Sequence, residues 1–264
     1  MAEAVITSKD NSRVKAVVKL MSSARARREA GLFVAEGLRL VLDAALNGYK
    51  LPEVYYTEEL RNKHPEELEK VLESAENTYL VSDEVMVKLS DTVTPQGIVA
   101  VLETPTYGEL TATKGLLVAL ENTANPSNLG AIARSAEAFG VKGIVISSTS
   151  CDPYSPKSLR AGMGALIRLP IYIVPDFEAA LCSLQKCGMK LYASVVSENA
   201  TDITKTPKSD GRVLLIGNEA NGITSHIAEL CDHRVTIPMI GRAESLNAAT
   251  AATVLIWEMQ KGGK

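Results

Sequence analysis

The sequence contains few of the residues that build metal sites and disulfide frameworks. Its 264 residues include four cysteines and three histidines, and the histidines are scattered. The cysteines lie at Cys151, Cys182, Cys187 and Cys231 and form no Cys-x-x-Cys pair. This spacing argues against zinc and predicts reduced thiols of a cytosolic protein, although bridges between distant cysteines stay open. We therefore expect no bound metal.

Long hydrophobic runs and low-complexity tracts are also missing. No apolar stretch approaches the roughly 18 residues that span a bilayer. The amino-terminal segment lacks the uninterrupted apolar core of a signal peptide. The absence of Gln/Asn-, Gly/Ser- and Pro-rich tracts excludes a fibrous or largely disordered chain. With 46% hydrophobic residues, the chain can bury a sizeable core. These features predict a folded cytoplasmic protein with no membrane partner.

The net charge of −3 is too small to indicate a partner by itself. Positive charge is nevertheless concentrated in residues 9–28, where seven Lys and Arg accompany a single acidic residue, Asp10. Such clustering is typical of a surface that binds a polyanion. A solvated helix face explains the same charges equally well.

The amino-terminal half alternates between helical and strand patterns. We expect a basic helix that begins at Asn11 or Ser12 and ends at Gly31, followed by strands at 32–34, 54–56, 79–81 and 98–102 and helices at 37–46, 65–75 and 84–89. This alternation predicts a small α/β domain with its own sheet. Pro105 and Gly108 mark the best linker candidate. The predicted domains are therefore residues 1–105 and residues 106–264.

The second half alternates in the same way. The expected strands are 116–120, 143–146, 171–174, 190–195, 213–216 and 234–237, and the expected helices are 126–139, 177–187, 223–230 and 245–259. The first of these strands is a nearly continuous apolar run, which is typical of a buried parallel strand. Strands that alternate with helices predict a parallel sheet, with ligand sites at the strand ends.

Polar loops follow three of the predicted strands. In the first, Asn128 lies in the opening turn of a helix, where free N–H groups bind anions, and Arg134 lies nearly opposite the apolar stripe. In the second, the spacing of Gly217 and Gly222 matches the start of a phosphate loop, but no Gly-Lys-Ser/Thr follows. Glu219 in this loop could bind hydroxyls or amides. An ordinary helix cap and an exposed turn are the alternative interpretations.

The third loop, residues 237–247, precedes the last helix. Ser245 and Asn247 can cap that helix or bind a ligand. The alanines that follow permit close approach of another helix, which tight packing alone would also explain. A Gly-x-Gly-x-x-Gly fingerprint is absent, because Gly162-Met-Gly164 is followed by Ala-Leu-Ile. This absence argues against an NAD enzyme and against a Rossmann-type methyltransferase.

Taken together, the three loops resemble the SpoU (TrmH-type) branch of the SPOUT RNA methyltransferases. The segments that carry this resemblance are PSNLGAIARSAEAFG (126–140), LLIGNEANGI (214–223) and IPMIGRAESLNAATAA (237–252), with RAGMGALIRLP (160–170) between the first two. Residues 27–46 resemble part of the substrate-binding domain that precedes the catalytic domain in many members.

The resemblance implies an α/β fold whose parallel sheet carries a C-terminal trefoil knot, preceded by a small α/β RNA-binding domain. It also implies S-adenosylmethionine as cofactor, methyl transfer to a ribose 2′-oxygen of structured RNA, and a homodimer. By motif position, the catalytic residues would be Arg134, Asn128, Glu219, Ser245 and Asn247, and the cofactor-binding residues Ile216, Gly217, Ile237, Met239 and Leu246. Two positions depart from the family pattern: Gly162 stands where Ser is common, and Ala248 where a branched residue is common.

Arginine stays protonated in proteins, so Arg134 is a doubtful general base. We expect it to align the ribose and phosphate and to stabilise the developing alkoxide, with Asn128 and Ser245 orienting it. Three alternatives remain: a knot-fold RNA-binding protein without catalysis, a nucleotide-dependent enzyme of another class, and a methyltransferase with a different RNA target. Transfer RNA, ribosomal RNA and a resistance role on ribosomal RNA all fit the branch, and the extra amino-terminal domain favours ribosomal RNA.

Overall fold

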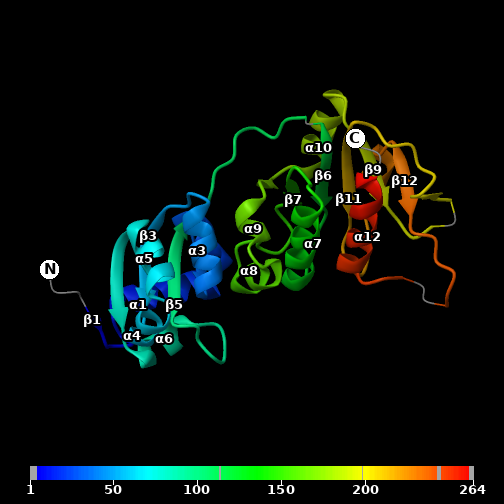
Figure 1. Cartoon of the computed structure of the whole chain (residues 1–264). Helices are drawn as coiled ribbons and strands as arrows, with labels where there is room; N and C mark the ends of the chain where they lie inside the picture. The colour runs from blue at the N-terminus through cyan, green and yellow to red at the C-terminus, as the bar shows by residue number, and fades with distance from the viewer. Residues whose placement is uncertain (1–4, 113, 198, 243–244, 262–264) are drawn as a thin grey trace. The chain divides into compact units, whose positions relative to one another are not determined.

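The computed structural model describes residues 5–112, 114–197, 199–242 and 245–261. The chain divides into two compact units. The first comprises Met1–Thr106 with Tyr154–Arg160, and the second comprises Tyr107–Pro153 with Ala161–Lys264. Each unit has its own sheet (Figure 1). Within the described residues, none of the helices has the length and apolar character needed to cross a bilayer.

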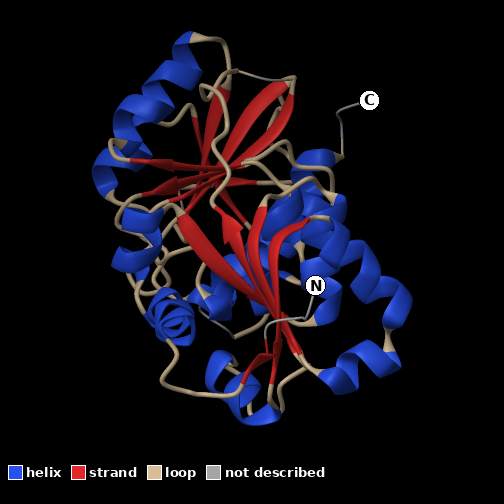
Figure 2. Ribbon diagram, turned by 90° about the vertical axis from the view of Figure 1, so that its left-hand side faces the viewer, coloured by secondary structure: helices blue, strands red, loops and turns tan. Residues whose placement is uncertain are grey.

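The first unit is a five-stranded mixed sheet with helices packed against it (Figure 2). Its strands are β1 (Val5–Ile6), β2 (Leu32–Glu36), β3 (Leu51–Tyr56), β4 (Ala75–Val81) and β5 (Ile98–Glu103). Its helices are α1 (Ser12–Ser22), α2 (Ala24–Ala30), α3 (Leu38–Leu46), α4 (Glu58–Lys63), α5 (Pro65–Glu73) and α6 (Asp83–Leu89). The strand order is β1-β4-β3-β5-β2, and β5 runs antiparallel to both of its neighbours. The predicted α/β unit is therefore present, with the additional elements β1 and α4.

The basic segment forms two helices, so the prediction of one continuous helix is wrong. Ser23 is extended (φ −127°, ψ 112°), and its hydroxyl caps α2 by accepting from the Ala26 N–H. Arg27 is only 6% exposed and donates to the carbonyl oxygens of Leu20 (2.6 Å) and Met21 (3.0 Å). Arg27 therefore completes the carboxyl end of α1, where carbonyls lack helical partners, and does not belong to an RNA-binding face.

Most other cations of this segment already have acidic partners. Ion pairs join Lys9 to Glu84, Arg13 to Glu53, Lys15 to Asp10 and Arg25 to Glu29. These contacts support the interpretation of a solvated, ion-paired surface more than a dedicated polyanion site.

The second unit is a seven-stranded sheet in which all strand pairs are parallel. Its strands are β6 (Gly115–Leu120), β7 (Ile144–Ser147), β8 (Ile171–Val174), β9 (Lys190–Ser194), β10 (Thr201–Asp202), β11 (Gly211–Ile216) and β12 (His233–Thr236). Its helices are α7 (Pro126–Ala138), α9 (Ala165–Arg168), α10 (Phe177–Lys186), α11 (Ser225–Leu230) and α12 (Ala248–Gln260), while α8 (Pro156–Gly162) is divided between the units. The order is β10-β12-β9-β11-β6-β7-β8, which confirms the predicted parallel sheet.

The last helix begins three residues later than predicted. Asn247 has non-helical dihedrals, and its side-chain oxygen accepts from the N–H groups of Ala249 (2.9 Å) and Thr250 (3.3 Å). Asn247 is therefore the N-cap, and Ser245 lies in the preceding loop. α12 packs against α7, β6 and β11, and Ala249 and Ala252 are buried. The small residues thus permit the close packing expected from the sequence.

Candidate active site

Two of the predicted loops leave the sheet side by side. β6 and β11 are adjacent parallel strands in register, so their last residues, Leu120 and Ile216, are paired. The Glu121 N–H continues the ladder by donating to the Ile216 carbonyl over 2.9 Å. Because parallel strands end at the same edge of a sheet, the loops that begin at Glu121 and Gly217 meet at the position where such sheets bind ligands.

The loop after β11 is a tight turn that requires glycine. Asn218 and Gly222 exchange both backbone hydrogen bonds, at 3.0 and 2.9 Å. A Cβ atom on Gly217 would lie 2.1 Å from the carbonyl carbon of Gly222. The side-chain oxygen of Asn218 accepts from the backbone of Ala220 and Asn221 inside the turn. The spacing of Gly217 and Gly222 therefore builds a compact turn and not a phosphate loop.

Glu219, at the tip of this turn, is bonded to the loop after β6. Its carboxylate accepts from the N–H groups of Ala124 and Asn125, each at 3.1 Å, and from the Asn128 side-chain amide at 3.0 Å. Partial burial works to raise the pKa of Glu219, but the hydrogen bonds from Asn128 and the backbone outweigh it, and the pKa lies below its ordinary value. Glu219 is therefore a charged carboxylate that joins two loops.

Asn128 extends this connection to the third loop. Its amide nitrogen donates to Glu219, and its amide oxygen accepts from the Asn247 amide at 3.2 Å. Asn128 is 8% exposed, so its polar atoms are satisfied by protein partners. The structure thus brings Glu219, Asn128 and Asn247 into one hydrogen-bonded chain, although they are far apart in the sequence.

The remaining two catalytic candidates, Arg134 and Ser245, take no part in these hydrogen bonds. Arg134 is exposed on α7, away from the buried Leu129, Ile132 and Ala133, as the apolar stripe predicts. None of the residues that the structure describes hydrogen-bonds to Arg134 or forms an ion pair with it. Ser245 is exposed and likewise makes no hydrogen bond within the described ranges. Both side chains are therefore available to a bound partner.

A cavity of about 770 Å³ lies beside the chain of polar residues. All five predicted cofactor residues line it, and Glu219 and Ser245 also contribute; the five are Ile216, Gly217, Ile237, Met239 and Leu246. Its described lining combines apolar side chains with strand-end backbone and contains one carboxylate but neither Lys nor Arg. Such a lining does not fit a polyphosphate, whereas it fits a nucleoside that carries a positive charge.

Two further residues support the cavity wall and were not singled out from the sequence. Glu121 is 5% exposed and accepts from the N–H (2.9 Å) and hydroxyl (2.7 Å) of Thr224, which precedes α11. Asn122 has a positive φ of 53°, and its carbonyl accepts from the Asn218 amide at 2.8 Å. A polar residue directly after a buried strand is the signal that could have identified Glu121. No cluster of metal-ligating side chains occurs within the described part of the chain.

Two protein-family models match this chain. The description "SpoU rRNA Methylase family" applies to residues 115–257, and "MRM3-like substrate binding domain" applies to residues 11–100. A 23S rRNA (guanosine(2553)-2'-O)-methyltransferase from Bacillus subtilis is 29% identical, over 97% of this chain and 98% of the relative. A 23S rRNA (uridine(2479)-2'-O)-methyltransferase from Streptomyces viridochromogenes is 30% identical, over 96% and 90%.

The chain is also similar to solved structures of proteins named as rRNA or SpoU methyltransferases. The AdoMet-bound rRNA methyltransferase from Sinorhizobium meliloti is similar with a TM-score of 0.88 and 29% identity, covering 97% of both chains. The SpoU methyltransferase AviRb from Streptomyces viridochromogenes, in complex with AdoMet, has a TM-score of 0.84 and 26% identity, covering 96% of this chain and 100% of that one.

Proposed function

Because the chain belongs to the SpoU rRNA methylase family, we propose that it transfers a methyl group from S-adenosylmethionine to a ribose 2′-oxygen of ribosomal RNA. One structural observation carries this function. The hydrogen bonds among Glu219, Asn128 and Asn247 join three loops beside a cavity. The described lining of this cavity contains one carboxylate and neither Lys nor Arg. The relatives named as 23S rRNA methyltransferases, which match nearly the whole chain, support ribosomal over transfer RNA.

The cavity residues would hold the cofactor. S-adenosylmethionine supplies a methyl group carried on a sulfonium cation. Ile216, Ile237, Met239 and Leu246 offer apolar surface to such a ligand, and Gly217 keeps the adjacent turn closed. The ionised Glu219 contributes the negative potential that favours a cation over a phosphate.

Arg134 is the residue we assign to the RNA. A guanidinium remains protonated and presents a planar fork of donors that matches phosphate oxygens. It would align the ribose and stabilise the alkoxide that develops as the 2′-oxygen bonds to the methyl carbon and the sulfur–methyl bond breaks. The 2′-hydroxyl proton would pass to an adjacent phosphate oxygen. The hydrogen bonds of Asn128 and Asn247 are already used within the protein, so these two are positioning residues, while Ser245 remains available to orient the ribose.

The arrangement of the whole chain forms part of the same proposal. Residues 1–105 would bind RNA, supported by the substrate-binding match over residues 11–100, and residues 106–264 would carry the reaction. A trefoil knot is supported by the path of the chain after β11. β12 pairs with β9 on the side away from β11, and the chain then returns as α12 to pack against β6 and β11. A homodimer is supported by the exposed apolar Val254 and Trp257 on α12. A ribosomal RNA substrate supports a cytoplasmic location.

Methylation of defined RNA tests the function directly. Purified protein with isotopically labelled S-adenosylmethionine is expected to label 23S rRNA that lacks the modification, and ribose-methylation mapping is expected to find a single position. Transfer RNA and 16S rRNA serve as comparison substrates. Folded protein that binds no S-adenosylmethionine by calorimetry would contradict the methyltransferase assignment. Label in transfer RNA alone would contradict the choice of ribosomal RNA.

A further inference from the structure

An ion pair joins two helices of the second unit, α7 and α9, which pack against each other (Figure 1). The Nε atom of Arg168, the last residue of α9, donates to the Oε1 atom of Glu137 on α7 over 2.9 Å. About one-third of each side chain is exposed. Because water screens a pair at the surface, its contribution to stability is small. The position of the pair on α7 suggests a different role.

Glu137 lies one helical turn beyond Arg134. Side chains three residues apart on a helix are neighbours, with about 5–6 Å between their Cβ atoms. The Glu137 carboxylate is therefore within reach of the Arg134 guanidinium. Nevertheless, no residue in the described part of the chain forms an ion pair or a hydrogen bond with Arg134.

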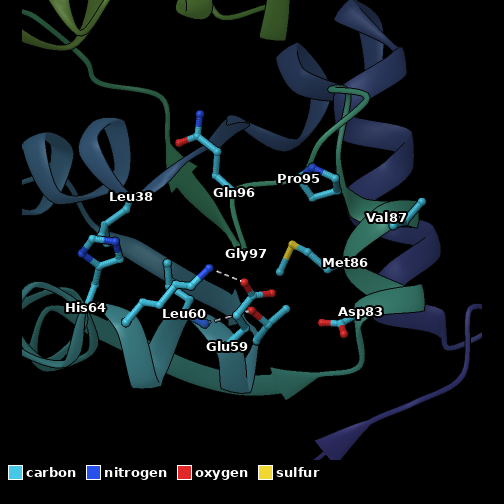
Figure 3. A pocket seen from close by; sticks show the side chains of 12 residues that line it. Leu38, Glu59, Leu60, His64, Asp83, Met86, Val87, Pro95, Gln96 and Gly97 are labelled. Carbon is cyan, nitrogen blue, oxygen red and sulfur yellow. Dashed lines mark hydrogen bonds and ion pairs between the residues drawn. The ribbon is translucent and has the colours of Figure 1, made fainter.

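Elsewhere in this chain, cations and carboxylates that lie one turn apart on a helix do form pairs. On α2, Arg25 donates to Glu29 at 2.6 Å, and there too the cation precedes the acid. On α4, Lys63 pairs with Glu59 where the two side chains line a cavity of the first unit (Figure 3). The unpaired arginine beside an acid on α7 is an exception to this pattern and requires a cause.

The loop before α9 places Arg168 over the carboxylate. Met163 and Gly164 have positive φ values of 47° and 88°, and they reverse the chain between α8 and α9. The buried side chain of Leu166 fixes α9 in the core. One guanidinium nitrogen of Arg168 also lies 3.5 Å from the Met163 carbonyl oxygen. Arg168 is therefore held in position to bind Glu137.

We propose that Arg168 is a positioning residue that keeps Arg134 available to the RNA by occupying Glu137. Without Arg168, the carboxylate would pair with Arg134 and hold its guanidinium along α7. The uncompensated charge of Glu137 would also repel RNA phosphates. This inference rests on the proposed role of Arg134 in methyl transfer, and it adds a residue that acts without touching the substrate.

A pair of substitutions at Arg168 and Glu137 tests the proposal. Arg168→Met removes the guanidinium and keeps most of the aliphatic stem, and it should slow single-turnover methylation by about two- to fivefold, the range of an exposed ion pair. Affinity for S-adenosylmethionine should not change, because neither residue lines the cofactor cavity. Arg168→Lys should recover most of the rate by returning a cation to Glu137. In the Glu137→Gln background, Arg168→Met should have no effect, because no carboxylate remains to bind Arg134.

Chemical modification gives a second measurement that does not depend on methyl transfer. Phenylglyoxal reacts with accessible guanidinium groups, and mass spectrometry of peptides measures its rate at Arg134. This rate should fall in the Arg168→Met protein and return when Glu137→Gln is added. Circular dichroism establishes that each variant is folded, and Arg168→Ala is a second variant with the same expected results.

Lys190→Ala is the control, because it breaks an ion pair of the same unit with Asp232. Lys190 begins β9 and therefore lies at the opposite edge of the parallel sheet from the candidate site, so neither measurement should change. An equal loss of rate in the Glu137 and Glu137→Gln backgrounds would overturn the proposal, since Arg168 would then act on the fold or on RNA directly. Unchanged modification of Arg134 in the Arg168→Met protein would also overturn it. Wild-type protein that transfers no methyl group would instead contradict the proposed function.

Discussion

The polar residues of the candidate site divide by whether the protein itself satisfies them. Glu219, Asn128 and Asn247 hydrogen-bond to one another, so they order the loops before any ligand arrives. Arg134 and Ser245 are exposed and unbonded within the described residues. A side chain without a protein partner can respond to the substrate, and this difference supports our proposal that Arg134 acts on the RNA while the three bonded residues act by positioning.

Replacement of Arg134 by alanine is expected to lower methyl transfer at least about a hundredfold, the scale of losing one preorganised donor. Cofactor affinity should change little because Arg134 is not in the cavity lining. Arg134→Lys should recover little, since an ammonium lacks the planar fork. Single-turnover methylation with enzyme in excess measures the rate, and calorimetry measures cofactor binding. A near wild-type rate for a folded, cofactor-binding alanine variant would refute this role.

The Glu219 carboxylate should make stability depend on pH. Its pKa in the folded protein lies below the ordinary value of 4.5. The ionised form therefore contributes stability above that ordinary value, and the contribution disappears as pH falls through the lower folded pKa. Glu219→Gln should be less stable than wild type at pH 7, and the difference should shrink in acid. Thermal unfolding of both proteins at stepwise lower pH measures it, and a difference independent of pH would show that ionisation contributes nothing.

At the scale of elements, the junction of α1 and α2 shows how a charged residue becomes structural. Arg27→Ala leaves the Leu20 and Met21 carbonyls without a buried donor, at a cost of about 1–3 kcal/mol. Arg25→Ala, the control, removes an exposed pair with Glu29 and should cost less than about 1 kcal/mol. Denaturant unfolding distinguishes the two variants. Equal stabilities would mean that the buried contacts of Arg27 contribute no more than a surface ion pair.

Among the basic residues of α1 and α2, the exposed ones without an ion pair should contribute most to the affinity for RNA. Arg28 is exposed and has no ion pair within the described chain, so it is available to phosphates, and Arg28→Ala should reduce the affinity for RNA and flatten its salt dependence. Titrations at several salt concentrations measure both quantities. An unchanged slope would leave α2 as a solvated surface, in keeping with the ion pairs of the neighbouring basic residues.

At the scale of the whole molecule, the exposed face of α12 is the feature that a second copy would cover. Trp257 is 52% exposed although it packs against Phe139, with ring centroids 5.2 Å apart, and Val254 is 39% exposed. Exposed aromatic groups are enriched at interfaces. Trp257→Arg should therefore convert the proposed dimer into a folded monomer, as sedimentation equilibrium would measure. A wild-type monomer at micromolar concentration would contradict the dimer.

The sequence by itself determined most of the strands and helices of both units. Runs of apolar residues between polar turns predicted the alternation of strands and helices, because burial on both faces of a parallel sheet requires such runs. The three loops were identified from residue types and order, and the five residues that the family resemblance predicts to bind the cofactor all line the cavity. One of these five, Gly217, must be glycine because a Cβ atom there would clash with the backbone of Gly222. These features depend on neighbours within a few positions.

Tertiary structure alone decided which distant groups became partners. Asn128 accepts from Asn247 and donates to Glu219 because the parallel register of β6 and β11 places their loops side by side, and no local pattern encodes that register. The sequence predicts Arg27 to be a surface cation. The break in the helix at Ser23 instead places its guanidinium against the carboxyl end of α1, where it donates to the Leu20 carbonyl. Hydrogen bonds and burial act through space, so their consequences appear only when the chain is folded.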